Sequence, residues 1–244
     1  MRAKVDIYTE NIPLSNRMLF VSLIKHSLET ANPEYFNELY KFENKKNKKI
    51  KPFTFSTYME DYEIGKENIK IKGKVNLIIS TPDTELFINI YNGLLNTYDF
   101  SYKNKYKLKI GKITLLNEKQ IHSEEVTFKT ISPIAIKDKD GKFLRIEDEN
   151  YVHELNYISD LSLKVFRGYG LERSLEFIPV NYEKVVIKED IKGFNEITNK
   201  KVFYITGYKG TFKLRGDKVD LKLLYSLGIG FRKSEGFGNV EVIG

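Results

Sequence analysis

The sequence contains no cysteine and no tryptophan, and it has only three histidines and six prolines. Without cysteine, the chain can form neither a disulfide nor a thiolate metal site. No apolar run reaches the roughly 18 residues that a membrane-spanning helix needs. The opening MRAKVDIYTE alternates and carries acidic residues, unlike a signal peptide with an apolar core. These absences predict a soluble, cytoplasmic protein without a metal or other cofactor.

Charged residues make up 30% of the chain and hydrophobic residues 41%, which is typical of a folded protein. The net charge is +7 and the isoelectric point is about 9.1. A basic excess favours a polyanionic partner, either nucleic acid or a membrane surface, although a lysine-rich surface without a partner gives the same total. Tyrosine and phenylalanine supply all of the 13% aromatic residues and can stack on nucleobases or fill the core.

The hydrophobic pattern of the first half predicts the order strand, helices, two strands, helix, strand. The expected strands are 2–9, 52–59, 69–81 and 106–116, and the expected helices are 16–31, 33–42 and 85–95. Asn32-Pro33 separates the first two helices, because the residue before proline disfavours helical backbone angles. The order βαββαβ indicates a ferredoxin-like, RRM-like unit.

The second half repeats this scheme without any repeat of residues. Strands are expected at 126–136, 175–187, 201–216 and 239–243, and helices at 149–166 and 220–227. The hydrophilic stretch 117–125 is the expected linker. We therefore predict an α+β protein with tandem ferredoxin-like domains at 1–120 and 121–244.

The sequence GIGFRKSEGFGNV, at 228–240, contains four closely spaced glycines: Gly228, Gly230, Gly236 and Gly238. A dinucleotide-binding fingerprint is excluded because Lys233 replaces its third glycine and because the loop follows a helix. A Walker loop is excluded because Gly-Lys-Ser/Thr is missing. The loop either holds a phosphate, with Arg232 and Lys233 supplying the charge, or is a connection that needs positive φ angles.

Four stretches, in this order, resemble the CRISPR-associated endoribonucleases that cleave repeat RNA, the sixth Cas family. They are NIPLSNRMLFVSLIKHSLETANPEYFNEL (11–39), KPFTFST (51–57), FKTISPIAI (128–136) and the glycine loop at 228–238. The resemblance covers most of the chain, and it implies the same tandem ferredoxin-like fold that the pattern predicts.

The resemblance also implies an activity and partners. Such enzymes bind CRISPR repeat RNA and cut precursor crRNA without a metal. The neighbouring 2′-hydroxyl attacks the phosphate and leaves a 2′,3′-cyclic phosphate or a 3′-phosphate. Other Cas proteins of an effector complex are further expected partners, with the protein as monomer or homodimer and no membrane contact. The alternatives are a repeat-RNA-binding member that does not cleave and a structural subunit of an effector complex.

This reaction needs a base, an acid and positive charge on the phosphorane, and histidine suits proton transfer near neutral pH. His26 lies opposite the apolar arc of its predicted helix, so it is either catalytic or an exposed residue without a role. In the resemblance, Tyr40 stands where the family's usual histidine is expected, and Lys51 matches the lysine before the Phe-Thr motif. Lys25 is a secondary candidate. His122 and His153 complete the set of histidines.

The charge run ENKKNKKIK, at 43–51, is predicted to be an exposed loop that contacts phosphates. Its expected RNA-binding residues are Lys45, Lys46, Lys48 and Lys49. No group of Asp and Glu has a spacing typical of a metal site, so a metal-free reaction is expected.

Overall fold

The structure is a computed structural model, and it describes residues 1–42, 45–46, 49–189 and 203–244. The chain divides into two compact units. The first consists of residues 1–51 and 57–117, and the second of residues 52–56 and 118–244. A domain boundary near residue 120 remains a proposal.

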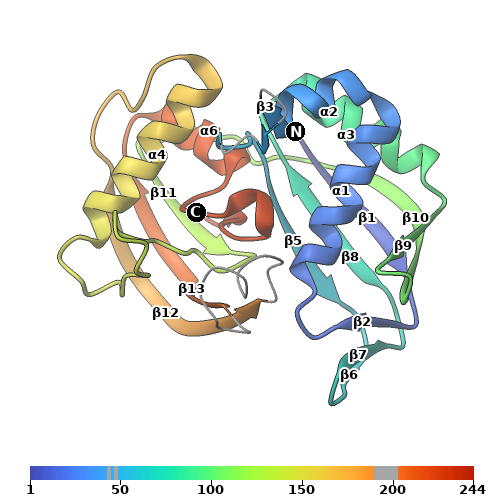
Figure 1. Cartoon of the computed structure of the whole chain (residues 1–244). Helices are drawn as coiled ribbons and strands as arrows, with labels where there is room; N and C mark the ends of the chain where they lie inside the picture. Colours follow the sequence, from blue (N-terminus) through green and yellow to red (C-terminus); the bar gives the residue numbers. More distant parts are fainter. Residues whose placement is uncertain (43–44, 47–48, 190–202) are drawn as a thin grey trace. The chain divides into compact units, whose positions relative to one another are not determined.

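The main sheet of the first unit has the strand order β5-β8-β1-β10-β9. Its strands are β1 (Arg2–Tyr8), β5 (Thr54–Met59), β8 (Val75–Ser80), β9 (Asp99–Tyr102) and β10 (Tyr106–Leu116). Of β5, residues 57–59 belong to the first unit and residues 54–56 to the second. Helices α1 (Arg17–Ala31) and α3 (Thr84–Asn96) cover one face of this sheet (Figure 1). Alternate residues of β1, namely Ala3, Val5 and Ile7, are buried, as expected for a strand with one face on the core.

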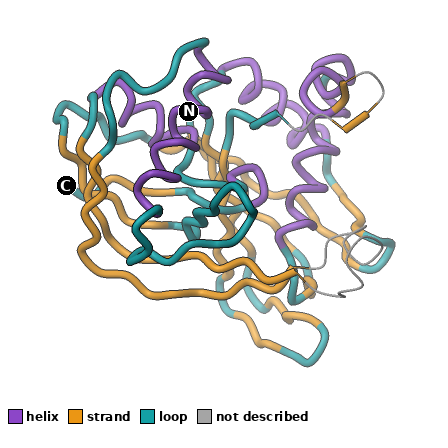
Figure 2. The backbone as a smooth tube through the Cα atoms, turned by 60° about the vertical axis from the view of Figure 1, so that its left-hand side comes forward, coloured by secondary structure: helices purple, strands orange, loops and turns teal. Residues whose placement is uncertain are grey.

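The second unit has a four-stranded sheet in the order β12-β13-β11-β14. Its strands are β11 (Glu125–Thr130), β12 (Glu176–Glu189), β13 (Phe203–Arg215) and β14 (Val240–Val242). The helices are α4 (Tyr151–Arg167), α6 (Lys218–Leu227) and the short 3₁₀ helix η1 (Lys233–Glu235). The long antiparallel pair β12–β13 can be followed in Figure 2.

Both units arrange their βαββαβ strands in the same order. If the four strands of each motif are numbered along the chain, both sheets read 2-3-1-4, with β9 added at the end of the first. All strand pairs with a described register in these two sheets are antiparallel. The predicted tandem ferredoxin-like fold is confirmed.

Local chemistry sets the junction between α1 and α2 (Pro33–Tyr40). The backbone N–H of Asn32 donates to the carbonyl of Leu28 at 2.9 Å, and its side chain accepts from the N–H of Tyr35 at 3.0 Å. Asn32 therefore ends one helix and caps the next, and Pro33 occupies a first-turn position where no N–H is needed.

Two predictions around the charge run are wrong. The predicted helix at 33–42 ends at Tyr40, because residues 41–42 form β3 (Lys41–Phe42). The run itself is not wholly a loop, because β4 (Lys45–Lys46) pairs with β3. The pairing satisfies backbone groups that a solvated loop would leave to water.

The predicted strand at 69–81 is two strands, β7 (Asn68–Ile71) and β8, with a turn at Lys72 and Gly73 between them. β7 belongs to a separate sheet with β2 (Asn11–Pro13) and β6 (Tyr62–Ile64). A Cβ on Gly73 would lie 2.6 Å from the carbonyl oxygen of Glu60, so the turn depends on glycine. The predicted strand at 126–136 likewise ends at Thr130.

Candidate functional site

The glycine loop at 228–238 is held in a conformation that favours glycine at every one of its glycine positions. Gly228, Gly230, Gly236 and Gly238 have φ angles of 82°, 90°, 86° and 70°. A Cβ on Gly238 would lie 2.0 Å from the carbonyl oxygen of Ile229. The glycines therefore serve positive φ and close backbone approach.

This loop binds the KPFTFST stretch within the second unit. The hydroxyl of Thr54 donates to the carbonyl of Phe237 at 2.8 Å. The side-chain amide of Asn239 donates to the hydroxyl of Ser56 at 3.0 Å. Both contacts are buried, so a strand residue and a loop residue 183 positions apart are joined in the interior.

The loop also binds the SPIAI stretch. The N–H of Gly238 donates to the carbonyl of Pro133 at 2.8 Å, and the N–H of Phe231 donates to that of Ala135 at 2.9 Å. The N–H of Asn239 donates to the hydroxyl of Ser132 at 2.9 Å. Three of the stretches that carry the resemblance thus form one packed assembly, and these loop amides already have protein partners.

The two cations of the loop face the protein. Lys233 is only 4% exposed, its Nζ donates to the hydroxyl of Ser162 in α4 at 2.8 Å, and burial lowers its pKa to about 7. The guanidinium of Arg232 pairs with Glu235 and lies 5.4 Å from the ring centroid of Phe203. The burial of its ammonium does not favour the expected phosphate contact of Lys233, and that contact stays a prediction.

In the first unit, the ammonium groups of two lysines lie near the same tyrosine ring. The Nζ of Lys25, in α1, lies 4.5 Å from the ring centroid of Tyr40 at the end of α2. The Nζ of Lys51, in the segment before β5, lies 5.4 Å from the same centroid. It also donates to the carbonyl of Lys49 at 2.7 Å. We call Lys25, Tyr40 and Lys51 the lysine–tyrosine cluster.

The electrostatics of this cluster are unusual for surface lysines. Burial, followed by the charges of Lys25 and Lys49, lowers the pKa of Lys51 to about 8. Burial raises the pKa of Tyr40, so its phenol stays protonated at neutral pH. The cluster therefore combines an amine that exchanges its proton near neutral pH with a hydrogen-bond donor and a second cation.

Comparison with known proteins gives the family. A model of the C-terminal part of the CRISPR associated protein Cas6 matches residues 116–242, and a model of the Cas6 N-terminal part matches residues 11–112. The chain belongs to the Cas6 family. The resemblance seen in its sequence is confirmed.

Curated relatives and solved structures of Cas6 proteins agree with this assignment. The chain is 30% identical to "CRISPR-associated endoribonuclease Cas6 1" of Methanocaldococcus jannaschii, over 98% of this chain and 92% of that protein. It is 27% identical to "CRISPR-associated endoribonuclease Cas6" of Pyrococcus furiosus, over 96% and 84%. The structure of a Cas6-related protein from Pyrococcus furiosus aligns with a TM-score of 0.82 and 22% identity, over 100% and 98%, which supports the shared fold.

Within this Cas6-family chain, His26 directly follows Lys25 of the lysine–tyrosine cluster in α1, but its ring contact is with a different element. It is exposed, and its ring centroid is 5.4 Å from that of Phe100 in β9. β9 and β5 are opposite edges of the main sheet, and Lys51 lies three residues before the start of β5. The predicted role of His26 as the base stays a prediction. His122 and His153 are exposed as well.

The remaining predicted residues give a mixed outcome. Lys45 and Lys46 form β4, Lys49 is exposed beside the cluster, and Lys48 lies outside the described residues. Within the described ranges, no three His, Asp or Glu side chains gather as a metal site would require, and no helix has the length and apolarity needed to cross a membrane.

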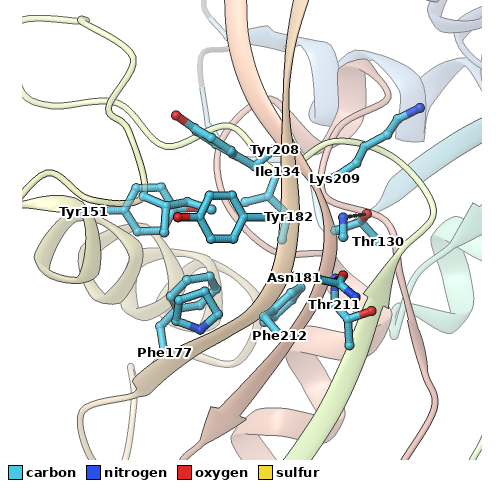
Figure 3. Close-up of a pocket in the computed structure, with 13 residues that line it drawn as sticks. Thr130, Ile134, Tyr151, Phe177, Asn181, Tyr182, Tyr208, Lys209, Thr211 and Phe212 are labelled. Atoms are coloured by element: carbon cyan, nitrogen blue, oxygen red, sulfur yellow. Dashed lines mark hydrogen bonds between the residues drawn. The ribbon is translucent and has the colours of Figure 1, made fainter.

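The second unit contains an aromatic pocket that the sequence analysis did not predict (Figure 3). Its rings come from α4, β12 and β13, and they contact one another: the centroids of Tyr151 and Phe177 are 5.4 Å apart, and those of Tyr182 and Tyr208 are 5.8 Å apart. The hydroxyl of Tyr182 donates to Glu147 at 2.7 Å. Because the rings fill much of the space themselves, we assign this pocket to the rim of the core.

Proposed function

We propose that this Cas6-family endoribonuclease binds CRISPR repeat RNA and cleaves precursor crRNA at the lysine–tyrosine cluster, in the cytoplasm and without a metal ion. The observation that carries the proposal is the meeting of Lys25 and Lys51 on the ring of Tyr40. Two cations brought together in a partly buried place form a ready site for a phosphate. The names of the two curated relatives support the reaction class.

The proposed reaction is attack of the 2′-oxygen on the adjacent phosphorus. The new O–P bond forms as the bond to the 5′-oxygen breaks, which leaves a 2′,3′-cyclic phosphate and a 5′-hydroxyl. The neutral fraction of Lys51 takes the proton of the 2′-hydroxyl, and the 5′-oxygen takes a proton from water as it leaves. The ammonium of Lys25 and the phenol of Tyr40 stabilise the negative charge on the phosphorane oxygens. Hydrolysis of the cyclic product gives a 3′-phosphate.

The first experiment is single-turnover cleavage of labelled repeat RNA in excess EDTA. Cleavage should continue in EDTA and should stop when the nucleotide 5′ of the cut is 2′-deoxy, because the attacking group is then missing. The rate should rise with pH through about 8, the pKa of Lys51. Cleavage of the 2′-deoxy substrate would point to water as the attacking group and would refute this mechanism.

Substitution of His26 separates it from the cluster. His26→Ala should leave the rate within about twofold of wild type, while Tyr40→His should raise it, since imidazole has a pKa of about 6.5 and is a better base near neutral pH. A large loss of rate in His26→Ala, with normal RNA binding, would return the role of base to His26.

A second candidate function is binding of repeat RNA without cleavage. It is favoured by the absence of a histidine from the cluster and by the raised pKa of Tyr40, which makes that residue a poor base. Wild-type protein that binds repeat RNA tightly but gives no product between pH 6 and 9.5 would establish it. For either function, we propose that the protein acts as a monomer or homodimer together with other Cas proteins of an effector complex.

A further inference from the structure

The face of the main sheet that α1 and α3 leave uncovered carries an exposed tyrosine at the end of the central strand β1. Side chains two residues apart on a strand share a face, so Tyr8, Asp6 and Lys4 lie opposite the buried Val5 and Ile7. Tyr8 is 47% exposed. An aromatic ring of this size in contact with water, rather than core, needs an explanation.

The ring of Tyr8 lies on a glycine of the neighbouring strand. A Cβ on Gly111 of β10 would be 2.6 Å from Cε2 and 3.2 Å from Cδ2 of Tyr8. Gly111 sits where the pairing of β1 with β10 changes register, between Ile7↔Ile110 and Val5↔Ile113. The missing side chain and the bulge let the ring rest on the backbone of β10, while 47% of Tyr8 stays exposed.

Lysines flank this ring on the same face. In register, Tyr8 is opposite Lys109, and Lys107 lies two residues further along β10; both lysines are exposed. The Nζ of Lys109 is 4.7 Å from the ring centroid of Tyr98. Lys105, in the turn before β10, is exposed as well. Successive lysines on one face of a strand are about 7 Å apart, so they form a row of positive charge.

The acidic groups of this face do not cancel the row. Asp6 is bound by Lys74, whose Nζ lies 2.9 Å from its carboxylate, and by Lys4 at 3.8 Å. Asp99 is opposite Lys109 in the pairing of β9 with β10 and offsets part of its charge, whereas Lys107 is opposite the neutral Ser101. A flat ring beside a row of lysines is the combination that binds single-stranded nucleic acid, through base stacking and phosphate contacts.

We infer that Tyr8, resting on Gly111 and flanked by Lys107 and Lys109, is a stacking platform for one unpaired nucleobase of the bound RNA. The inference rests on the proposed function in so far as RNA is the ligand. It adds a binding site in the first unit that is built from other residues than the lysine–tyrosine cluster. Tyr8 binds and orients a nucleotide and takes no part in proton transfer.

The test is fluorescence anisotropy with labelled single-stranded repeat RNA. Tyr8→Ala should bind about 10- to 100-fold more weakly, because base–aromatic stacking has about this effect per base. Tyr8→Phe keeps the ring and should bind within about twofold of wild type. Tyr62→Ala is the matched control, because Tyr62, in β6, is also 47% exposed. Lys107→Ala and Lys109→Ala should each lower the salt slope by about 0.7.

Cleavage kinetics separate the two proposals. In Tyr8→Ala the protein concentration at half-maximal rate should rise about 10- to 100-fold, while the rate at saturating protein stays unchanged. Suppose that the wild-type protein binds and cleaves the RNA. If Tyr8→Ala then binds with the same affinity as wild type, the inference is overturned and the proposed function is left intact. A wild type that binds no repeat RNA would overturn both.

Ultraviolet crosslinking covers the case in which Tyr8→Ala is poorly folded, since the ring covers a glycine of the sheet. Repeat RNA carrying 4-thiouridine should crosslink wild-type protein at the peptide that contains Tyr8. Crosslinks confined to other peptides, with the same RNA bound, would overturn the inference. If Tyr8→Phe loses as much affinity as Tyr8→Ala, the inference is also overturned, because Tyr8→Phe still has the ring.

Discussion

Lys51 in the first unit and Lys233 in the second unit are both buried, with 7% and 4% of their surface exposed. Burial lowers the pKa of each, to about 8 and about 7. Their surroundings differ. Lys51 shares the ring of Tyr40 with a second ammonium, that of Lys25, whereas Lys233 donates to one hydroxyl, that of Ser162.

The difference separates a binding site from a packing contact. Two ammonium groups in one partly buried place repel each other, and an incoming phosphate relieves that repulsion. Burying a single ammonium inside a unit has a desolvation penalty, and its hydrogen bond links a loop to a helix. Among buried lysines, the neighbouring charges therefore indicate function better than burial does.

The largest expected effect concerns catalysis. Lys51→Ala should slow single-turnover cleavage by about 10²- to 10⁴-fold, because it removes a proton acceptor from the reaction. Lys233→Ala is the paired variant, and once the measured folded fraction is taken into account its rate should match wild type. Equal losses of rate in the two variants would remove the distinction between the two lysines.

The next effect concerns the glycine loop. Gly238→Ala should lower the free energy of unfolding by about 3 kcal/mol or more, because φ is positive and the new Cβ would strike the carbonyl of Ile229. Gly141→Ala is the control: its φ is 84°, but nothing lies within 4 Å of a Cβ there, so it should cost only about 1 kcal/mol. Urea denaturation measures both, and equal costs would contradict the packed arrangement of the loop.

A smaller effect concerns pH. The folded-state pKa of Lys233, about 7, is below the unfolded value of 10.5, so between these pH values the unfolded chain binds the extra proton. Stability should therefore rise with pH from 7 toward 9.5. Lys233→Met should be more stable than wild type at pH 7 and should show a shallower rise. Urea midpoints at pH 7 and 9.5 check this; an unchanged slope would mean that Lys233 is not the titrating group.

The smallest expected effect concerns Arg232. Its guanidinium already pairs with Glu235, so Arg232→Ala should change RNA affinity less than about twofold and leave the salt slope unchanged. Lys49→Ala, beside the lysine–tyrosine cluster, should instead lower the slope by about 0.7. A large drop in the slope for Arg232→Ala would restore the loop as an RNA contact.

The sequence predicted the elements better than it predicted their partners. Period and helix breakers are local, so the βαββαβ order and the helix junction at Asn32 could be recognised from neighbouring residues. The alternation of 69–81 continues through Lys72 and Gly73, so the turn there left no mark in the hydrophobic pattern. That Gly73 passes close to Glu60 is a tertiary fact that only the folded chain reveals.

The candidate site was predictable in composition but not in arrangement. Tyr40 and Lys51 were named through the resemblance to the family, Lys25 was a secondary candidate, and the helical wheel correctly predicted that His26 is exposed. The contact of His26 with Phe100 joins residues far apart in the chain, and no local pattern encodes it. The burial of Lys233 was missed for the same reason, since its partner belongs to a helix much earlier in the sequence.

The hydrogen bonds of Thr54 and Ser56 have a consequence for how the protein can be made. Residues 52–56 leave the ribosome well before the loop residues that bind them, which lie 183 positions later. These hydrogen bonds can therefore form only after almost the whole chain has been synthesised. A fragment of residues 118–244 expressed alone would lack it and would expose the carbonyl of Phe237 and the amide of Asn239. An added peptide containing residues 51–57 should then bind that fragment and complete its fold.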